Sequence, residues 1–282
     1  MMDIIIPHPK NFEKKLNQLR QDGAKKLHIL TDFDKTLTKA FHKGRKIYSI
    51  INILRKKKYL SPDYSKKAYE LFNTYHPIEE NPNISKLKKK KKIKEWYEKH
   101  FDLLIASHLN IRDIEKVISS EKLEIRKGVD IFFKTAGKKE IPIIILSAAG
   151  LGKESISKFL KKEKINTQNT YIIANGFVWD KNGYATKVQE PIIHSHNKDE
   201  IILKNFYFYK NVKNRKNILL LGNSISDTDM SKGFKAKTVL NIGFMNKNID
   251  QLLPVYKKHF DMIIMNDGNF NKVNKILKEI IG

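Results

Sequence analysis

The 282-residue sequence predicts an α/β fold, in which a Rossmann-like parallel sheet carries helices on both faces and a block of helices is inserted into it. From about Lys26 onward, short apolar runs alternate with helical patterns, as in a parallel sheet. Several runs consist only of Ile, Leu and Val, which is typical of strands buried on both faces. Between about Phe41 and Lys127 the periodicity is helical and no convincing strand occurs, so this region is predicted to be the insertion.

The predicted core comprises residues 1–41 and 128–282. Its strands are expected at residues 27–30, 141–146, 171–174, 218–221, 238–242 and 262–265. Its helices are expected at residues 154–164, 199–209, 227–233, 249–259 and 269–281.

The predicted insertion comprises residues 42–127, with helices at 47–57, 62–74, 93–107 and 111–120. Because it directly follows the first core strand, we expect it to lie over the carboxyl edge of the sheet, where a lid would be. The lysine run 88–92 lies in this block. A solvated surface is the favoured interpretation of the run, and a phosphate-binding patch is the alternative.

Two carboxylates, Asp32 and Asp34, follow the first predicted strand directly. Ligands of open α/β sheets bind at the carboxyl ends of strands. A D-x-D pair there can hold a hard cation and can supply a nucleophile and an acid or base. Taken alone, the segment fits a solvated turn with helix-capping aspartates equally well.

Three later strand ends carry polar groups. Ser147 and Ala148 begin a small-residue segment in which a hydroxyl and backbone N–H groups can approach an anionic oxygen. Lys198 follows an apolar stretch and can neutralise phosphate charge. A loop containing Asn223 and Asp227 follows the strand at 218–221 and can complete an oxygen-rich Mg²⁺ site.

Four motifs follow one another along the chain, each beside a predicted strand: D-x-D-x-T, then Ser, then Lys, then G-N-x-x-x-D. This order resembles the haloacid dehalogenase (HAD) superfamily of aspartate-nucleophile phosphatases. Within it, residues 75–82 and 95–99 look like the helical cap of cytosolic 5′-nucleotidase III, the pyrimidine 5′-nucleotidase family. Core residues 141–150, 194–198, 218–233 and 241–246 are similar as well. The similarity extends from about Lys26 to the C-terminus and implies a HAD-like core with a helical cap.

The resemblance implies that Asp32 is the nucleophile, which forms an aspartyl-phosphate. The resemblance implies that Asp34 acts as the general acid and base. It also implies that Lys198 offsets the charge between the nucleophile and the phosphate, and that Ser147 and Ala148 bind the phosphate.

The resemblance also implies a Mg²⁺ site formed by Asp32, the carbonyl oxygen of Asp34, Asn223 and Asp227. Related enzymes usually carry Asp where this chain has Asn223, so weaker metal binding is expected. Asp229 is expected to be an exposed acid near a helix start.

In the cap, Glu79 matches the family's base-contacting glutamate, and His100 falls at a second substrate-facing position where this chain differs in residue type. Trp96 is expected to pack between helices, whereas Tyr97 fits either packing or stacking on a base. The histidines at positions 194 and 196 are expected to be structural neighbours of the lysine rather than metal ligands.

Composition narrows the class of protein. The absence of cysteine excludes disulfides and thiolate zinc sites. No signal peptide and no apolar run long enough for a bilayer is found, so we expect a soluble cytoplasmic protein without membrane contact. The net charge of +25 fits either an RNA partner or the amino-acid usage of an A/T-rich coding sequence, and the spread of the lysines favours the second.

The leading hypothesis is a monomeric, Mg²⁺-dependent 5′-nucleotidase that hydrolyses nucleoside 5′-monophosphates, with pyrimidine nucleotides first and 7-methylguanosine monophosphate second. The first alternative is a phosphatase of the same superfamily acting on a sugar phosphate or phosphoserine. The second is a basic RNA-binding protein on a retired phosphatase fold, which the intact motif residues argue against. The preferred base and any phosphate transfer to a nucleoside remain open at this stage.

Overall fold

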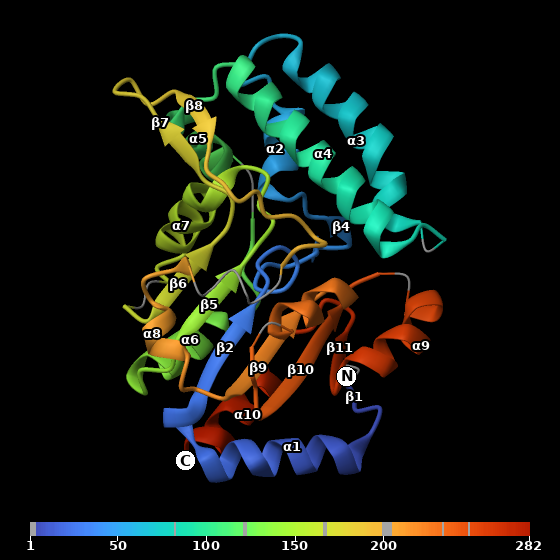
Figure 1. Cartoon of the computed structure of the whole chain (residues 1–282), viewed down its shortest axis with the longest axis vertical. Coiled ribbons are helices and arrows are strands. Elements are labelled where there is room, and N and C mark those ends of the chain that lie inside the picture. Colours follow the sequence, from blue (N-terminus) through green and yellow to red (C-terminus); the bar gives the residue numbers. More distant parts are fainter. Residues whose placement is uncertain are drawn as a thin grey trace.

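The computed structural model describes residues 4–81, 83–120, 123–165, 168–198, 205–232, 234–247 and 249–282. Its core is a seven-stranded sheet with the order β1-β11-β10-β9-β2-β5-β6 (Figure 1). All neighbouring strands are parallel except β1, which pairs with β11 in the antiparallel sense. The strands are β1 (Ile4–Ile5), β2 (Leu27–Thr31), β5 (Ile143–Leu146), β6 (Thr170–Ile173), β9 (Asn217–Gly222), β10 (Thr238–Met245) and β11 (Met262–Met265).

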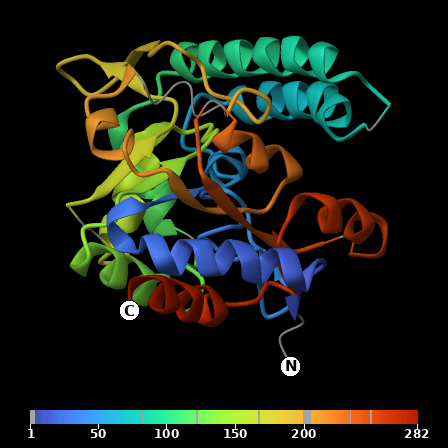
Figure 2. The same cartoon turned by 60° about the horizontal axis from the view of Figure 1, so that its bottom comes forward.

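Helices cover both faces of this sheet, as the sequence predicts. Because side chains alternate along a strand, Ile143 and Ile145 of β5 join one apolar cluster while Ile144 and Leu146 join another. The first face is covered by α1 (Pro9–Asp22), α6 (Val129–Lys138) and α10 (Asn271–Ile281). The second is covered by α8 (Tyr209–Val212), the 3₁₀ helix η3 (Ile225–Ser231) and α9 (Ile249–His259). Figure 2 shows α1 (blue) and α10 (dark red) lying side by side beneath the sheet.

The six predicted core strands all occur in the sheet, with small shifts at their ends. The prediction missed the two-residue strand β1 and the helices α1 and α6. The helix expected at 199–209 lies outside the described residues over 199–204. Residues 206–208 form a bend and a turn, and α8 begins only at Tyr209, so this part of the prediction is wrong.

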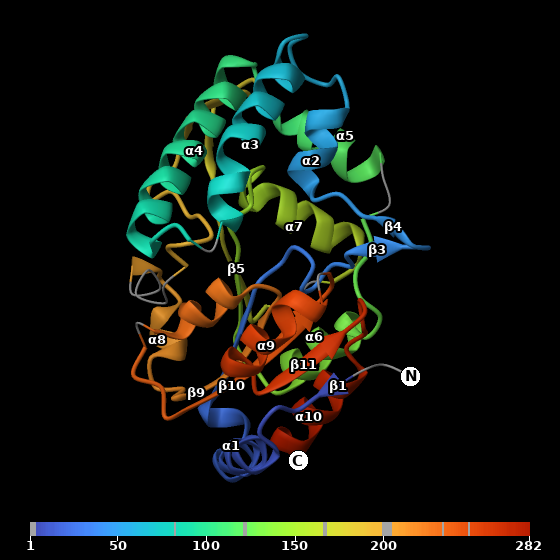
Figure 3. The ribbon, with the colours of Figure 1, turned by 90° about the vertical axis from the view of Figure 1, so that its right-hand side faces the viewer.

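The helical block lies over the carboxyl ends of the core strands (Figures 1 and 3). It consists of α2 (Ile50–Lys56), α3 (Tyr64–Glu80), α4 (Lys86–Ala106) and α5 (Ile111–Ser120). Helix α3 continues through Pro77 beyond its predicted end, and α4 includes the lysine run. Another helix, α7 (Gly152–Lys162), follows β5 and packs against α5.

Two short hairpins depart from the predicted pattern. Strands β3 (Phe41–His42) and β4 (Arg45–Lys46) pair around a turn at Lys43 and Gly44, whose backbones both have positive φ. The expectation that residues 41–127 contain no strand is therefore wrong, because a turn with positive φ at both central residues permits a two-residue ladder here. Strands β7 (Phe177–Trp179) and β8 (Ala185–Val188) form the second hairpin.

Within the described part of the chain, every helix is too short or too polar to cross a bilayer.

Candidate active site

A cavity of about 1100 Å³ lies between the carboxyl edge of the sheet and the helical block. All nine residues that the sequence nominated for the site line this cavity. From the core these are Asp32, Asp34, Ser147, Ala148, Lys198, Asn223 and Asp227, and from the helical block they are Glu79 and His100.

Lys198 bridges two carboxylates at the floor of the cavity. Its Nζ donates to Asp32 Oδ1 at 2.5 Å and to Asp227 Oδ1 at 3.0 Å, and the side chain is only 6% exposed. Burial alone would lower the pKa of Lys198, but the carboxylates of Asp227 and Asp32 outweigh it and raise the pKa above its usual value. The ammonium group therefore stays charged between the two acids.

The two acids of the D-x-D pair are both shielded from water. Burial raises the pKa of Asp32 to about 7, against the opposing effect of the Lys198 ammonium. Burial also raises the pKa of Asp34, with Lys35 and Lys198 acting in the opposite direction. A carboxyl with a raised pKa is suited to proton donation, whereas a nucleophilic carboxylate must be ionised by neighbouring positive charge.

Asn223 lies among oxygen atoms. With its NH₂ group turned toward them, it donates to Asp32 Oδ2 at 3.1 Å, to the carbonyl oxygen of Asp34 at 3.1 Å and to Thr36 Oγ1 at 3.2 Å. A half-turn of the amide exchanges its nitrogen for its oxygen. The same side chain can then join a carboxylate and a carbonyl in the all-oxygen donor set that a hard cation such as Mg²⁺ prefers, so these residues fit such an ion.

Asp227 is engaged on both of its oxygens. Oδ2 accepts from the backbone N–H groups of Asn223 (3.0 Å) and Ser224 (2.9 Å), closing a capping box at the start of η3, while Oδ1 accepts from Lys198. This geometry lets Asp227 position the loop and the lysine. Within the described residues no group of three His, Asp or Glu side chains is arranged to hold a metal, so a cation here depends on the carbonyl and amide oxygens.

Two side chains of α4 contact the loop that follows β5. Tyr97 donates from its hydroxyl to the carbonyl of Ala148 at 3.0 Å, and His100 Nε2 lies 2.8 Å from the carbonyl of Gly150. Burial lowers the pKa of His100 to about 3, so the ring is neutral and Nε2 carries the proton that the carbonyl accepts. The neighbouring Ser147 is buried at the end of β5, facing the cavity.

Three polar contacts hold the tips of α3 and α4 to the core. Ser195 donates to Glu79 Oε1 at 2.5 Å, Lys86 pairs with Asp229 at 2.5 Å, and Lys247 pairs with Glu80 at 3.2 Å. The expectation that Asp229 is an exposed acid is wrong, because its side chain is only 18% exposed and contacts lysines from both parts of the molecule.

The prediction that Trp96 packs between helices agrees with the geometry. Trp96 is buried and stacks on Tyr75 with ring centroids 6.1 Å apart. It also borders the cavity, as Tyr97 does. His194 is buried and accepts from the backbone N–H of His196, and neither histidine belongs to a metal-binding group among the described residues.

Sequence analysis missed two arginines that shape the site. Arg126 is 1% exposed and donates to the carbonyl oxygens of Lys35 (2.6 Å) and Thr36 (2.9 Å), which fixes the D-x-D loop. Arg55 is buried in α2 and borders the cavity. The signal available was arginine itself, which is rare in this lysine-rich chain and is the residue suited to buried, multiply bonded positions.

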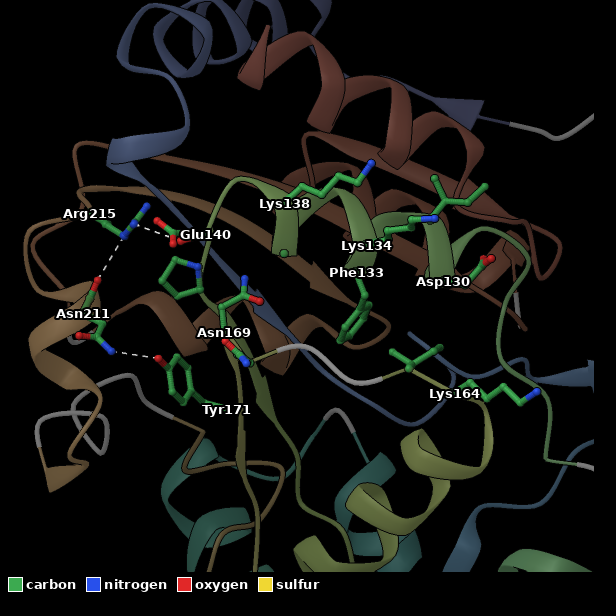
Figure 4. Close-up of a pocket in the computed structure, with 15 residues that line it drawn as sticks. Asp130, Phe133, Lys134, Lys138, Glu140, Lys164, Asn169, Tyr171, Asn211 and Arg215 are labelled. Atoms are coloured by element: carbon green, nitrogen blue, oxygen red, sulfur yellow. Dashed lines mark hydrogen bonds between the residues drawn. The ribbon is translucent and has the colours of Figure 1, made fainter.

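A second hollow of about 1030 Å³ lies at the amino ends of β5, β6 and β9, whereas the D-x-D pair follows the carboxyl end of β2. Figure 4 shows the residues that line this hollow. Lysines 134, 138 and 164 on its rim are exposed. The guanidinium of Arg215 donates hydrogen bonds to backbone carbonyls, including those of Asn211 and Glu140, both at 3.2 Å. This hollow shares no residue with the candidate active site.

Comparisons with known proteins identify a family from the sequence and relatives of the fold from solved structures. The family model described as pyrimidine 5′-nucleotidase (UMPH-1) matches residues 35–281. The 7-methylguanosine phosphate-specific 5′-nucleotidase A of Xenopus laevis is 29% identical over 271 residues, which cover 96% of this chain and 93% of the relative. The crystal structure of cytosolic 5′-nucleotidase IIIB bound to cytidine superposes with a TM-score of 0.91 at 24% identity, covering 98% of this chain and 93% of the other. A phospho-aspartyl intermediate analogue of phosphoserine phosphatase shares the fold more distantly, with a TM-score of 0.53 at 19% identity over 88% of this chain and 97% of the other.

Proposed function

This chain belongs to the pyrimidine 5′-nucleotidase family, and we propose that it is a Mg²⁺-dependent 5′-nucleotidase that hydrolyses nucleoside 5′-monophosphates to nucleoside and phosphate. Family membership makes it a hydrolase of phosphate monoesters and confirms the resemblance drawn from the motifs. The proposal is supported chiefly by the buried side chains of Asp32, Lys198 and Asp227, which are joined by hydrogen bonds. They lie with Asp34 in the cavity between the sheet and the helical block.

In the proposed reaction a carboxylate oxygen of Asp32 forms a bond to phosphorus as the bond from phosphorus to the sugar oxygen breaks. Asp34 gives its proton to that departing oxygen, so the nucleoside leaves neutral. In the second half Asp34 takes a proton from a water molecule that attacks the aspartyl-phosphate. Phosphate departs, and both acids return to their starting states.

The remaining core residues offset the charge of the phosphate and hold it in position. The Lys198 ammonium, held 2.5 Å from Asp32, reduces the repulsion between the carboxylate nucleophile and the phosphate dianion. Ser147 and the backbone at Ala148 lie on the same cavity, where they can donate hydrogen bonds to phosphate oxygens.

The metal would be held by Asp32, the carbonyl oxygen of Asp34 and Asn223, with Asp227 positioning the loop behind them. When bound, a divalent cation supplies neutralisation of the charge that develops on the phosphate oxygens.

For the base we propose Glu79 and His100 as the contacting residues, with pyrimidine nucleotides preferred and 7-methylguanosine monophosphate second. A carboxylate accepts from an exocyclic amino group, and Glu79 is placed on the cavity with Oε1 bonded to Ser195. The family model named for pyrimidine nucleotides and the relative named for 7-methylguanosine phosphate support this pair of candidates.

We also propose that the chain acts as a monomer in the cytosol and needs no nucleic-acid partner. Support for the compartment comes from the structural relative named as cytosolic. Size-exclusion chromatography with light scattering, and fractionation of cells expressing the tagged chain, test the two parts separately.

The direct test is phosphate release from a panel of nucleoside monophosphates, sugar phosphates and phosphoserine, with and without Mg²⁺. We expect turnover of nucleoside monophosphates that needs the metal, and a loss of roughly a thousandfold or more in Asp32→Asn. Turnover of another ester with none of any nucleotide would replace the proposal by the wider phosphatase alternative. Salt-sensitive RNA binding without hydrolysis would favour the retired-enzyme alternative.

Base contact is tested separately by Glu79→Ala. We expect this variant to keep its Asp32-dependent hydrolysis while the ratio of kcat/KM values between bases changes. An unchanged ratio across the panel would remove Glu79 from the base site.

A further inference from the structure

Tyr256 joins helix α9 to the loop that carries Asn223. Its hydroxyl donates to the backbone carbonyl of Asn223 at 2.5 Å, although the two residues are 33 positions apart in the chain. The side chain of Tyr256 is 5% exposed and borders the same cavity as Asn223. Because a carbonyl oxygen can only accept, the hydroxyl is the donor, and this bond fixes the carbonyl side of Asn223.

Both backbone groups of Asn223 are held by buried side chains. Its N–H group donates to Asp227 Oδ2 at 3.0 Å, and its carbonyl accepts from Tyr256. With the backbone fixed in this way, the amide of Asn223 reaches Asp32 Oδ2 and the Asp34 carbonyl oxygen, both at 3.1 Å. Hydrogen bonds made behind a metal ligand orient that ligand. Asp227 and Tyr256 therefore set together where the Asn223 side chain lies.

Tyr256 is itself held by a buried apolar cluster. Its ring packs against that of Phe260, with the ring centroids 5.1 Å apart. Phe260 in turn lies against Gly243 of β10, where an added Cβ would come within 2.7 Å of the Phe260 ring. The hydroxyl is thus presented to the Asn223 loop from a packed helix and strand, which is the kind of support that places a ligand accurately.

We propose that Tyr256 is a positioning residue whose hydroxyl makes the metal site selective for Mg²⁺ over the larger Ca²⁺. The inference rests on the proposed function, because it concerns the metal site of the same nucleotidase.

The two cations differ in how accurately their ligands must be placed. Mg²⁺ demands near-ideal octahedral geometry with short ligand bonds, whereas Ca²⁺ accepts longer bonds and a flexible arrangement. The amide of Asn223 carries no charge, so its contribution to binding depends on its position rather than on long-range attraction. Loss of the Tyr256 hydroxyl should therefore weaken the binding of Mg²⁺ more than that of Ca²⁺.

The experiment measures calorimetric binding of Mg²⁺ alone and of Ca²⁺ alone to the wild type, Tyr256→Phe and Tyr171→Phe. We expect Tyr256→Phe, which removes only the hydroxyl, to weaken Mg²⁺ binding about tenfold, as lost contacts behind metal ligands do. Ca²⁺ binding should weaken by less than about threefold, so that the preference for Mg²⁺ falls. Tyr171→Phe is the matched control, because its hydroxyl accepts from Asn211 Nδ2 at 2.9 Å beside the second hollow. Both affinities should stay unchanged in this control.

A merely structural hydroxyl would lower the urea midpoint of Tyr256→Phe and leave both metal affinities of the folded protein unaltered, and that result would overturn the assignment. Equal weakening for the two ions, or a wild type that binds neither, would overturn it as well.

If the wild type binds Mg²⁺ yet hydrolyses no nucleotide, the proposed function fails, and calorimetry still decides the role of Tyr256. Should Tyr256→Phe not fold, Phe260→Leu decides instead, because it keeps the hydroxyl but loosens the ring behind it. The preference for Mg²⁺ over Ca²⁺ should fall in that variant too, and an unchanged preference there would contradict the proposal.

Discussion

At the scale of single residues, Asn223 distinguishes the proposed metal site of this chain. Its amide lies 3.1 Å from both Asp32 Oδ2 and the Asp34 carbonyl, the two oxygens that would share a cation with it. An amide oxygen can be a metal ligand but carries no charge. The proposed site therefore has one negative charge fewer than a site with Asp at this position.

The variant Asn223→Asp should therefore bind Mg²⁺ more tightly, by roughly tenfold, because ligand charge raises the affinity of oxygen sites for divalent cations. The Mg²⁺ concentration needed for half-maximal hydrolysis, and direct calorimetry of Mg²⁺ binding, both measure this. Asn182→Asp makes the same chemical change in an exposed loop and should leave both values unchanged. Unaltered affinity in Asn223→Asp would show that this side chain is not a metal ligand.

His100 makes folding stability depend on pH. Its pKa is about 3 when folded, lowered mainly by burial, and near 6.5 when unfolded. Below pH 6.5 the His100 side chain binds a proton in the unfolded chain but not in the folded chain. The free energy of unfolding therefore falls as the pH drops from 6.5 toward 3. Between pH 7.5 and 5.5 this residue alone should cost about 1 kcal/mol.

Urea unfolding at the two pH values measures that loss in the wild type and in His100→Gln. The variant should lose less stability than the wild type by about the same 1 kcal/mol, although other groups titrate in both proteins. An identical pH dependence in the two proteins would contradict a buried neutral imidazole.

At the scale of elements, Arg126 connects three loops at the carboxyl edge of the sheet. Besides its bonds to the loop after β2, it donates to the carbonyl of Gly268 at 2.7 Å and to Asn246 Oδ1 at 2.9 Å, and it pairs with Asp267 at 2.9 Å. The loops after β10 and β11 are thereby tied to the D-x-D loop. A fully buried guanidinium can hold this junction because its fork satisfies several acceptors at once.

Arg126→Met should destabilise the fold by about 3 kcal/mol, because it leaves the Asp267 carboxylate and several carbonyls without their donor. Urea unfolding gives the free-energy change, and hydrolysis measured far below the unfolding midpoint reports the looser D-x-D loop. Arg45→Met, at an exposed position in β4, is the control and should change stability by less than about 0.5 kcal/mol. A similarly small change in Arg126→Met would mean that the junction does not stabilise the loops.

The elements that sequence analysis missed are short or peripheral. Helix α1 buries Phe12, Leu16 and Leu19 at helical spacing beneath the sheet, a pattern that the sequence contains but that precedes Lys26, where the predicted alternation of strands and helices begins. The β7–β8 hairpin has only a few residues in each strand, of which only the first is buried, so its pattern differs little from that of a loop. Only pairing with a partner strand identifies such segments.

At the scale of the whole molecule, the net charge of +25 creates a positive field around a cavity that accepts a dianion. Lysines of α4 overhang this cavity, with Lys86 and Lys89 on its lining and Lys88 and Lys91 exposed beside them. Substrate association is thus expected to be steered electrostatically.

The value of kcat/KM for a nucleoside monophosphate should fall several-fold as ionic strength rises from roughly 0.02 to 0.2 M, because salt screens the field. Reversing Lys88 and Lys91 to Glu should lower kcat/KM at low salt and flatten this dependence. Reversing Lys275 and Lys278 of α10, on the opposite side of the molecule, changes the net charge equally and should have little effect. Equal effects of the two double variants would assign the salt dependence to net charge rather than to the α4 lysines.

By itself the sequence determined the parallel core, the helical block after the first strand and the residues that gather in the cavity. These features follow from local patterns: continuous apolar runs specify buried strands, and ligand-binding residues of parallel strands gather at one edge of the sheet. Only the tertiary structure decided that Asp227 holds Lys198 and a loop, that Asp229 joins the two parts of the molecule, and that Arg55 borders the cavity. Those roles depend on which side chains meet across segments distant in sequence, and neither residue type nor spacing encodes such contacts.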